Sequence, residues 1–295
     1  MSAAMSEVLA RALAEIDKAS NKLAAAGIES SRLDAELLLA EAAGVTREAA
    51  ITGSLDLSPA TLKTFDAMVA RREKREPVAY ILGHKEFYSL DFEVTPAVLI
   101  PRPETEFVVS TALECVAGRA NARVLDVGTG SGAIAIAIAV NELRTRVTAV
   151  DISTDAIAVA SRNARRHRVD ERVAFRRSDC FEVLDGGPAL GTFDAIVANP
   201  PYLDDTEIGA LELEVRGYEP RLALSAGTGG LDIFRRIVAG VSRHLANDGE
   251  MIVEVGMEQA PVIAKLLEEA GLRVVAVIND FAGHPRVVHA RRSGE

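Results

Sequence analysis

The sequence predicts an α/β protein in which a small helical bundle precedes a larger domain built on a mostly parallel β-sheet. The first observation is length, because 295 residues exceed one small domain and suit two unequal ones. The second is that residues 6–75 are rich in Ala, Leu and charged residues, with apolar positions at helical spacing. The third is that, from Arg123 onward, apolar strand-like runs alternate with helical patterns, as in right-handed βαβ units.

Helical periodicity divides the N-terminal part into segments that we expect to pack as a bundle. Ser30 or Ser31 is expected to cap the second helix, and Gly44 to end it. Ser58 and Pro59 indicate an N-cap followed by proline at the first helical position. Residues 1–76 carry no cluster of catalytic residue types, so we expect them to form a stabilising, substrate-docking domain. The residues predicted to face its core are Val8, Leu9, Leu13, Ile16, Leu33, Leu37, Leu38, Leu62, Phe65 and Val69.

Residues 77–105 are expected to form a linker and a β-hairpin. The helical pattern ends at Glu76 and Pro77. From Phe87 to Ile100, aromatic and apolar residues nearly alternate with polar ones around Ser89 and Asp91. This alternation predicts a short hairpin between the two domains.

Residues 106–295 are expected to form the larger α/β domain, with seven strands and helices on both faces. Six apolar runs predict strands at residues 124–125, 147–150, 173–175, 195–198, 251–255 and 274–278. A seventh run, at residues 287–290, follows a short turn that contains Gly283 and Pro285. A hairpin connection of this kind predicts that the last strand is antiparallel to the one before it.

Composition and charge exclude several classes of protein. A hydrophobic content of 48% with 26% charged residues is typical of soluble globular chains. The net charge of −10 disfavours non-specific binding to nucleic acid or anionic lipid, so we expect no direct nucleic-acid partner and no membrane association. Neither the two cysteines nor the five histidines show metal-ligand spacing, and we expect no metal. A charged N-terminal region and the lack of a long apolar run predict a cytoplasmic protein.

A glycine-rich loop connects a strand to an apolar helix, and it consists of Gly128, Thr129, Gly130, Ser131 and Gly132. Glycines let the main chain approach a ligand closely, and the helix N-terminus that follows favours an anionic group. Asp151 ends the next strand, about 20 residues beyond the loop, a spacing that suits a carboxylate bound to a ribose diol. The loop and Asp151 are therefore predicted to bind a nucleoside cofactor.

The details of this loop indicate which cofactor it binds. The spacing of its glycines differs from the G-x-G-x-x-G pattern of nicotinamide binders, which disfavours a dehydrogenase. Asp126, just before the loop, suits a ligand with a positive group and would repel a pyrophosphate. The amino-acid end of S-adenosylmethionine is such a group, and we expect S-adenosylmethionine to be the cofactor.

A second motif, Asn199-Pro200-Pro201-Tyr202, follows the predicted fourth strand. Ligands of open α/β sheets bind outside the carboxyl ends of the strands, so the motif occupies a site position. The side-chain oxygen of Asn199 and the carbonyl of Pro200 can both accept hydrogen bonds from one NH2 group. Consecutive prolines fix the loop, and Tyr202 offers a flat face against a planar group. We therefore predict Asn199, Pro200 and Tyr202 as catalytic and all four residues as substrate-binding, with an amide or amine nitrogen as the methyl acceptor.

Taken together, these stretches resemble the HemK family, the S-adenosylmethionine-dependent protein-(glutamine-N5) methyltransferases that modify peptide-chain release factors. The resemblance covers nearly the whole chain, including the N-terminal helices. The glycine loop by itself resembles the class I methyltransferases in general, and the stretch at residues 100–106 makes the resemblance specific. The matching stretches are residues 100–106 (IPRPETE), 125–132 (LDVGTGSG), 199–202 (NPPY), 215–220 (VRGYEP) and 283–286 (GHPR).

The resemblance implies a class I methyltransferase fold with a Rossmann-like seven-stranded sheet. It implies that residues 128–132 and Asp151 hold the cofactor, that Asp179 and Cys180 line the adenine pocket, and that Asn199 touches both cofactor and substrate. The implied substrate is the glutamine of the Gly-Gly-Gln motif in a class 1 release factor, and the implied role is in translation termination. At Cys180 the family often has an aromatic residue, for which Phe181 is a possible substitute.

Two other functions remain as alternatives. One is an adenine-N6 methyltransferase acting on DNA or RNA, because the exocyclic amine of adenine presents the same planar NH2 group to an Asn-Pro-Pro-Tyr loop. The negative net charge disfavours it, and the basic helix face formed by Arg162, Arg165, Arg166 and Arg168 is better explained as solvated surface. A binding module without catalysis would be expected to have lost Asn199 or the acids, and it ranks below both.

Overall fold

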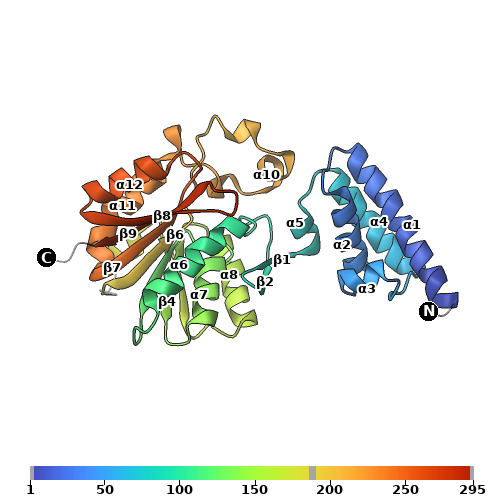
Figure 1. Ribbon diagram of the computed structural model, residues 1–295, viewed down its shortest axis with the longest axis horizontal. Helices are drawn as coiled ribbons and strands as arrows, with labels where there is room; N and C mark the ends of the chain where they lie inside the picture. Colours follow the sequence, from blue (N-terminus) through green and yellow to red (C-terminus); the bar gives the residue numbers. More distant parts are fainter. Residues whose placement is uncertain (1–2, 186–190, 293–295) are drawn as a thin grey trace. The chain divides into compact units, whose positions relative to one another are not determined.

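The computed structural model describes residues 3–185 and 191–292 and divides the chain into two compact units (Figure 1). The helical unit runs to Gly83 and also includes residues 212–218; the α/β unit contains the rest. The helical unit therefore continues beyond residue 76, where the sequence suggested a boundary. The reason is helix α5 (Val78–Leu82), whose Tyr80 and Ile81 are buried and which ends at Gly83 in the left-handed conformation.

The predicted bundle is present, and its start and stop signals act largely as expected. The Ser58 hydroxyl accepts a hydrogen bond from the backbone N–H of Thr61, with Pro59 at the first helical position. Gly44 ends α2 in the left-handed conformation, whereas the Ser30 side chain caps no backbone group there. The remaining helices of this unit are α1 (Ala3–Ala25), α2 (Ser31–Ala43), α3 (Arg47–Ile51), α4 (Pro59–Glu73) and α10 (Leu213–Tyr218).

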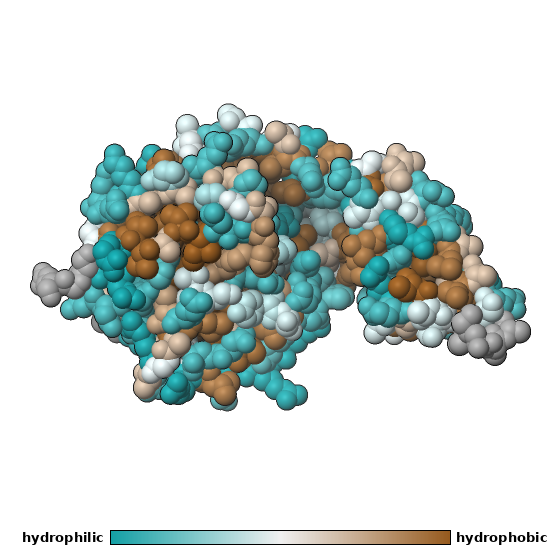
Figure 2. All heavy atoms as spheres, in the orientation of Figure 1, coloured by the Kyte–Doolittle hydropathy of each residue, from teal (hydrophilic) through white to brown (hydrophobic). Residues whose placement is uncertain are grey.

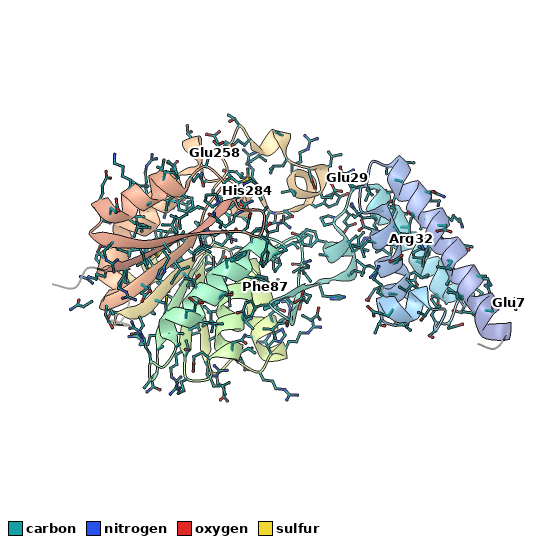
Figure 3. All side chains as sticks on the ribbon, in the orientation of Figure 1. Glu7, Glu29, Arg32, Phe87, Glu258 and His284 are labelled. Atoms are coloured by element: carbon teal, nitrogen blue, oxygen red, sulfur yellow. The ribbon has the colours of Figure 1, made fainter. Side chains whose placement is uncertain are left out.

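The face of α2 that meets the core differs from the predicted one. Leu33 is 45% exposed, whereas Ala35, Leu38 and Leu39 are fully buried. These three residues lie at i, i+3 and i+4, which is one face of an α-helix. Arg32, labelled in Figure 3, is 47% exposed and forms an ion pair at 2.8 Å with the buried carboxylate of Glu36, one turn later on α2.

The hairpin forms, but over a shorter segment than residues 87–100. Strand β1 (His84–Phe87) pairs with β2 (Leu90–Glu93), with Phe87 opposite Leu90. Tyr88 and Ser89 form the turn between the strands, and both have positive φ angles, of 51° and 60°. Phe87 (Figure 3) and Phe92 are buried with their rings 6.0 Å apart, so the hairpin is anchored in the core of the α/β unit.

The α/β unit contains the expected seven-stranded sheet, in the order β5-β4-β3-β6-β7-β9-β8. Its last strand is antiparallel to both neighbours, as predicted. The strands are β3 (Arg123–Val127), β4 (Arg146–Asp151), β5 (Val173–Arg177), β6 (Phe193–Ala198), β7 (Leu245–Glu254), β8 (Leu272–Asn279) and β9 (Pro285–Arg292). The helices are α6 (Glu106–Val116), α7 (Ala133–Asn141), α8 (Thr154–Arg166), α9 (Glu182–Asp185), α11 (Asp232–His244) and α12 (Ala260–Glu269), with 3₁₀ turns η1 (Pro103–Thr105), η2 (Ile208–Ala210), η3 (Arg221–Ala223) and η4 (Thr228–Gly230).

Two apolar cores cover the two faces of this sheet. Alternate residues of one strand enter different cores: Val124 faces the core with α6 and α7, and Leu125 the core with α11 and α12. Figure 1 shows the sheet between these helices. Within the described residues, no helix is long and apolar enough to span a membrane.

The sheet places the predicted motifs together at the carboxyl ends of three adjacent strands. Val127 of β3 is in register with Val150 of β4 and with Ala198 of β6, and all three strands are parallel. The residues that follow these positions are Gly128, Asp151 and Asn199. The order of strands also reverses between β3 and β6, which is where open α/β sheets bind ligands.

Candidate active site

A cavity of about 280 Å³ lies at the carboxyl edge of the sheet. It is bordered by the loops after β3, β4, β5 and β6, by the turn before α6, and by residues 220–225. Two predicted site residues, Gly132 and Tyr202, are not among those that line it. The predicted residues that do line it are Gly128, Thr129, Gly130, Ser131, Asp151, Asp179, Cys180, Asn199, Pro200 and Pro201.

The glycine loop leaves open space for a ligand. Gly128 and Gly130 have φ angles of 79° and 55°, in the left-handed region that favours glycine. A Cβ built on Gly130 would meet no atom within 4 Å. The backbone at Gly130 is therefore available for close approach from the cavity.

Gly132 has a different role, in packing. It also has a positive φ angle, of 83°, but a Cβ there would lie 2.8 Å from Ile136 and 3.1 Å from the Cβ of Ala160. Gly132 thus allows the start of α7 to approach α8 closely. Gly132 therefore shapes the loop without lining the cavity.

Asp151 is held by the loops on both sides of it. Its carboxylate accepts hydrogen bonds from the backbone N–H groups of Gly130 and Ser153, both at 2.9 Å. Burial raises the pKa of this carboxyl, and the hydrogen bonds from Ser153 and Gly130 oppose the increase. The carboxylate is therefore fixed at the cavity wall, in the place expected for a ribose partner.

Asp126 is fully buried and acts on the cavity indirectly. Burial raises its pKa to about 7, against a 2.6 Å hydrogen bond from the Thr129 hydroxyl. Among the residues that the structure describes, its Oδ1 atom has no hydrogen-bond partner. Thr129, not Asp126, lines the cavity. The expectation that the Asp126 carboxylate neutralises a positive group of the ligand stays a prediction.

The wall after β5 contains Asp179 and Cys180. Asp179 forms a 2.7 Å ion pair with Arg236, which also lines the cavity. Burial raises the pKa of Cys180 to about 11, so the thiol is neutral. Phe181 does not replace the aromatic residue that the family often has here, because its ring is buried in the core and stacks on His244 at 4.9 Å. Ile152 and Ile237 supply apolar lining instead.

The Asn-Pro-Pro-Tyr loop is held at both ends by side chains. The amide of Asn199 donates through Nδ2 to the Thr105 hydroxyl at 3.0 Å. At the other end, Gln259 donates through Nε2 to the Tyr202 carbonyl at 2.8 Å. The Tyr202 ring packs against the core that contains α11 and α12, and burial raises its pKa. Asn199 and Pro200 therefore face the cavity while Tyr202 anchors the loop.

Thr105 and Glu254 were not predicted as site residues. The Thr105 hydroxyl donates to Glu254 Oε2 at 2.6 Å, and Glu254 is 3% exposed at the end of β7. Burial raises the Glu254 pKa to about 7. An acid that ends an apolar strand was the available signal, since the same pattern identified Asp151. Thr105 lies within the stretch IPRPETE, whose resemblance to the family implied no role for this residue.

The charged residues of that stretch have structural partners. Arg102 lines the cavity and forms a 2.5 Å ion pair with buried Glu219. Glu106 accepts a hydrogen bond from the backbone N–H of Tyr88, which ties α6 to the hairpin. Arg162 pairs with Glu93, and Arg166 pairs with Asp91. The basic face of α8 is therefore partly neutralised by the hairpin.

A group of potential metal ligands lies away from the cavity. Within the described ranges, Cys115, Glu250 and His289 have ligand atoms within 4.8 Å of one another. None of the three lines the cavity. Glu250 accepts hydrogen bonds from the Cys115 thiol and from Arg291, and it contacts the His289 ring. Burial raises the pKa of Cys115, so this group holds together as a hydrogen-bonded network.

Family models of known proteins match residues in each of the two units. Residues 16–83 match the family model described as PrmC N-terminal domain, and residues 106–212 match that of the methyltransferase small domain. A release factor glutamine methyltransferase of Pseudomonas aeruginosa is 46% identical over 88% of this chain and 91% of its own length. That of Geobacter sulfurreducens is 42% identical over 91% of this chain and 92% of its own length.

A solved structure supports the fold. The methyltransferase from Pyrococcus furiosus aligns with 77% of this chain and 98% of its own, with a TM-score of 0.51 and 19% identity. At that identity the likeness concerns the fold alone, and it agrees with the sheet order given above. Given the relatives at 42% and 46% identity, the chain belongs to the family of release factor glutamine methyltransferases and has a class I methyltransferase fold.

Proposed function

We propose that this enzyme transfers a methyl group from S-adenosylmethionine to the side-chain amide nitrogen of a glutamine in a peptide-chain release factor. By resemblance, the glutamine is that of the Gly-Gly-Gln motif. The observation that carries the proposal is that Asn199 and Pro200 line the same cavity as Gly128, Gly130 and Asp151. A nucleoside site and a pair of acceptors for an NH2 group therefore open into one space.

The residues present fit S-adenosylmethionine. The open space at Gly130 suits close approach of the amino-acid end, and the fixed Asp151 carboxylate suits the ribose hydroxyls. Asp179 and Cys180, with Ile152 and Ile237, would surround the adenine. When bound, S-adenosylmethionine supplies a methyl group on a sulfonium, which is a good leaving group.

The protein then acts by holding the acceptor nitrogen. Asn199 Oδ1 and the Pro200 carbonyl would accept the two N–H groups of the glutamine amide and direct its nitrogen at the methyl group. On accepting the methyl group the nitrogen would release one proton to solvent, and Asn199 Oδ1 and the Pro200 carbonyl would stabilise the positive charge that develops there. Orientation of this kind can supply on the order of 7–11 kcal/mol of barrier reduction.

The decisive experiment is methyl transfer from labelled S-adenosylmethionine to four substrates. These are a purified class 1 release factor, its glutamine-to-alanine variant in the Gly-Gly-Gln motif, and DNA and RNA. Label on the unaltered factor alone is the expected result. Label on nucleic acid alone would replace this proposal with the adenine-N6 alternative.

We further propose that the helical unit docks the release factor. On the face in Figure 2, apolar side chains of this unit lie among hydrophilic ones, and Leu33 and Leu213 are exposed at 45% and 46%. The test compares KM for the whole factor and for a short Gly-Gly-Gln peptide. Leu33→Asp and Leu213→Asp should raise KM for the factor and leave that for the peptide unchanged.

Leu143→Asp provides the matched control, because Leu143 is 73% exposed and belongs to the α/β unit. It should change neither Michaelis constant. If the variants in the helical unit behave as this control does, the exposed leucines are not part of a docking surface.

A further inference from the structure

Three side chains from distant parts of the chain form a chain of hydrogen bonds at the cavity. Asn199 follows β6, Glu254 ends the neighbouring strand β7, and Thr105 ends the turn η1 before α6. Ala198 is in register with Val253, so Asn199 and Glu254 leave the sheet side by side. Thr105 bonds to both, at 3.0 Å from Asn199 Nδ2 and 2.6 Å from Glu254 Oε2.

The direction of these hydrogen bonds follows from the chemistry of the three groups. A hydroxyl has one proton to donate and lone pairs to accept with. Thr105 donates its proton to the Glu254 carboxylate, so toward Asn199 it can only accept. The group that donates to it must be the NH2 of Asn199, and the side-chain oxygen of Asn199 is thereby turned away from Thr105.

This orientation has a consequence for the substrate. If the side-chain oxygen of Asn199 faces the methyl-accepting side chain of the substrate, it can receive a hydrogen bond from a glutamine NH2 group. A glutamate carboxylate has no proton to donate to it. The opposite rotamer would present the Asn199 NH2 group, which suits a carboxylate and gives no acceptor for the amide. An amide side chain rotated by 180° fills nearly the same space, so packing alone does not choose between the two.

We propose that Thr105 and Glu254 are positioning residues that fix the amide orientation of Asn199 and so make the site selective for glutamine over glutamate. The proposal rests on the proposed function, because it assumes that the acceptor is a glutamine amide. Thr105 and Glu254 act through Asn199. Glu254 is surrounded by charged groups of both signs, namely Glu104, Arg102 and Arg286.

The test removes the Thr105 hydroxyl without changing the size of the side chain. Thr105→Val should lower kcat by about tenfold to a hundredfold, the effect of losing one or two buried hydrogen bonds, with little change in KM for S-adenosylmethionine. Thr105→Ser keeps the hydroxyl and should restore most of the activity. Thr111→Val is the matched control, since Thr111 is a buried threonine in α6 whose hydroxyl, within the described residues, bonds to the Phe107 carbonyl.

A second readout separates orientation from simple loss of structure. A release factor with glutamate in place of the reactive glutamine is used as a competitive inhibitor of each variant. The wild-type enzyme should bind the glutamine form more tightly, and Thr105→Val should bring the ratio of the two affinities close to one. Thr105→Ser and Thr111→Val should retain the wild-type ratio. If Thr105→Val does not fold, Thr105→Ala is measured in the same way.

The outcomes distinguish this inference from the function on which it rests. A wild-type enzyme that does not label the release factor would overturn the proposed function. A wild-type enzyme that labels it, together with a Thr105→Val variant whose affinity ratio equals that of Thr111→Val, would overturn the positioning role alone.

Discussion

Individual hydrogen bonds set the orientation of the polar side chains in this site. Asn199 and Asp151 are each held by one or two of them. Asn199 donates its NH2 group to the Thr105 hydroxyl, and the residue lines the cavity. Asp151 uses its two oxygens on the backbone of Gly130 and Ser153, which fixes its position without a cation. A substitution at one of these residues should therefore affect one ligand and spare the other.

Asn199→Ala should lower kcat strongly while the affinity for S-adenosylmethionine falls far less. Removing a hydrogen-bonding group that stabilises developing charge typically costs about 10²–10³ in kcat. Turnover is measured with labelled cofactor and affinity by calorimetry. Asn141→Ala is the control, because Asn141 bonds only within α7, to the Ala137 carbonyl. Equal losses of turnover and cofactor affinity would assign Asn199 mainly to the cofactor.

The rate should rise with pH through the ionisation of Glu254. Its pKa is raised to about 7 by burial and by the nearby Glu104, against the Thr105 hydrogen bond, Arg286 and Arg102. Above this pKa the carboxylate accepts the Thr105 proton and Asn199 keeps its orientation. Below it the protonated carboxyl can donate to Thr105, which is then free to donate to Asn199 Oδ1 and reverse the amide. The measurement is kcat from about pH 5.5 to 8.5, spanning this value.

Two variants identify the group that titrates. Glu254→Gln should remove the inflection near neutral pH. Asp126 has a pKa of about 7 as well, so Asp126→Asn is the necessary control and should keep the inflection. An inflection lost in Asp126→Asn and kept in Glu254→Gln would assign the pH dependence to the glycine loop.

At the scale of elements, the position of the glycine loop depends on how closely α7 approaches α8. The contact is possible because Gly132 has no Cβ facing Ile136 and Ala160. The loop also bonds to the neighbouring strand, since the N–H groups of Gly128 and Thr129 both donate to the Val150 carbonyl. Sheet and helix packing together therefore shape the glycine loop.

Gly132→Ala should destabilise the protein more than Gly130→Ala does. Both substitutions force alanine into a positive φ angle, at a cost of roughly 1–2 kcal/mol. Only the alanine at residue 132 also meets packed side chains, which adds about 1–3 kcal/mol of strain. Urea denaturation followed by circular dichroism measures the difference. Gly130→Ala should instead weaken cofactor binding, and equal stability of the two variants would contradict the packing role of Gly132.

At the scale of the whole molecule, a late segment of the chain completes the early helical unit. Helix α10 follows β6 in sequence, yet Glu214 forms ion pairs with Arg72 at 3.0 Å and Arg75 at 2.6 Å. Arg72 also pairs with Asp34 at 2.7 Å, and its side chain is 6% exposed. The Tyr218 hydroxyl donates to the Lys74 carbonyl in the same unit. Pro220, Leu222, Ala223 and Ser225, which follow α10 in sequence and belong to the α/β unit, line the cavity.

Arg72→Ala should destabilise the helical unit by about 3–5 kcal/mol, because it leaves the Asp34 and Glu214 carboxylates buried without their shared partner. Arg71→Ala, one residue earlier on α4, is the control. Arg71 pairs with Glu76 but is 46% exposed, so its loss should cost about 0–1 kcal/mol. Urea unfolding of the two variants gives the comparison. Similar midpoints would mean that Arg72 does not organise the unit.

Local features of this fold were predictable from residues close together in sequence. The Ser58 cap, the Gly44 stop, the apolar strands and the final hairpin depend on neighbours within a few residues. The predicted stripe of α2 was wrong at Leu33, because the choice between two apolar faces depends on the helices packed against them. The same limit applies to Tyr202, whose partly buried side chain packs against the core with α11 and α12 and does not line the cavity.

The sequence by itself determined the fold class, the glycine loop with Asp151, and the Asn-Pro-Pro-Tyr loop, since each is a short motif at a strand end. Only the tertiary structure decided that Thr105, Asn199 and Glu254 share one chain of hydrogen bonds, and that α10 joins the helical unit. The partners in that chain are 94 and 149 residues apart. Strand register and helix packing bring them within bonding distance, and neither can be read from the spacing of residues along a chain.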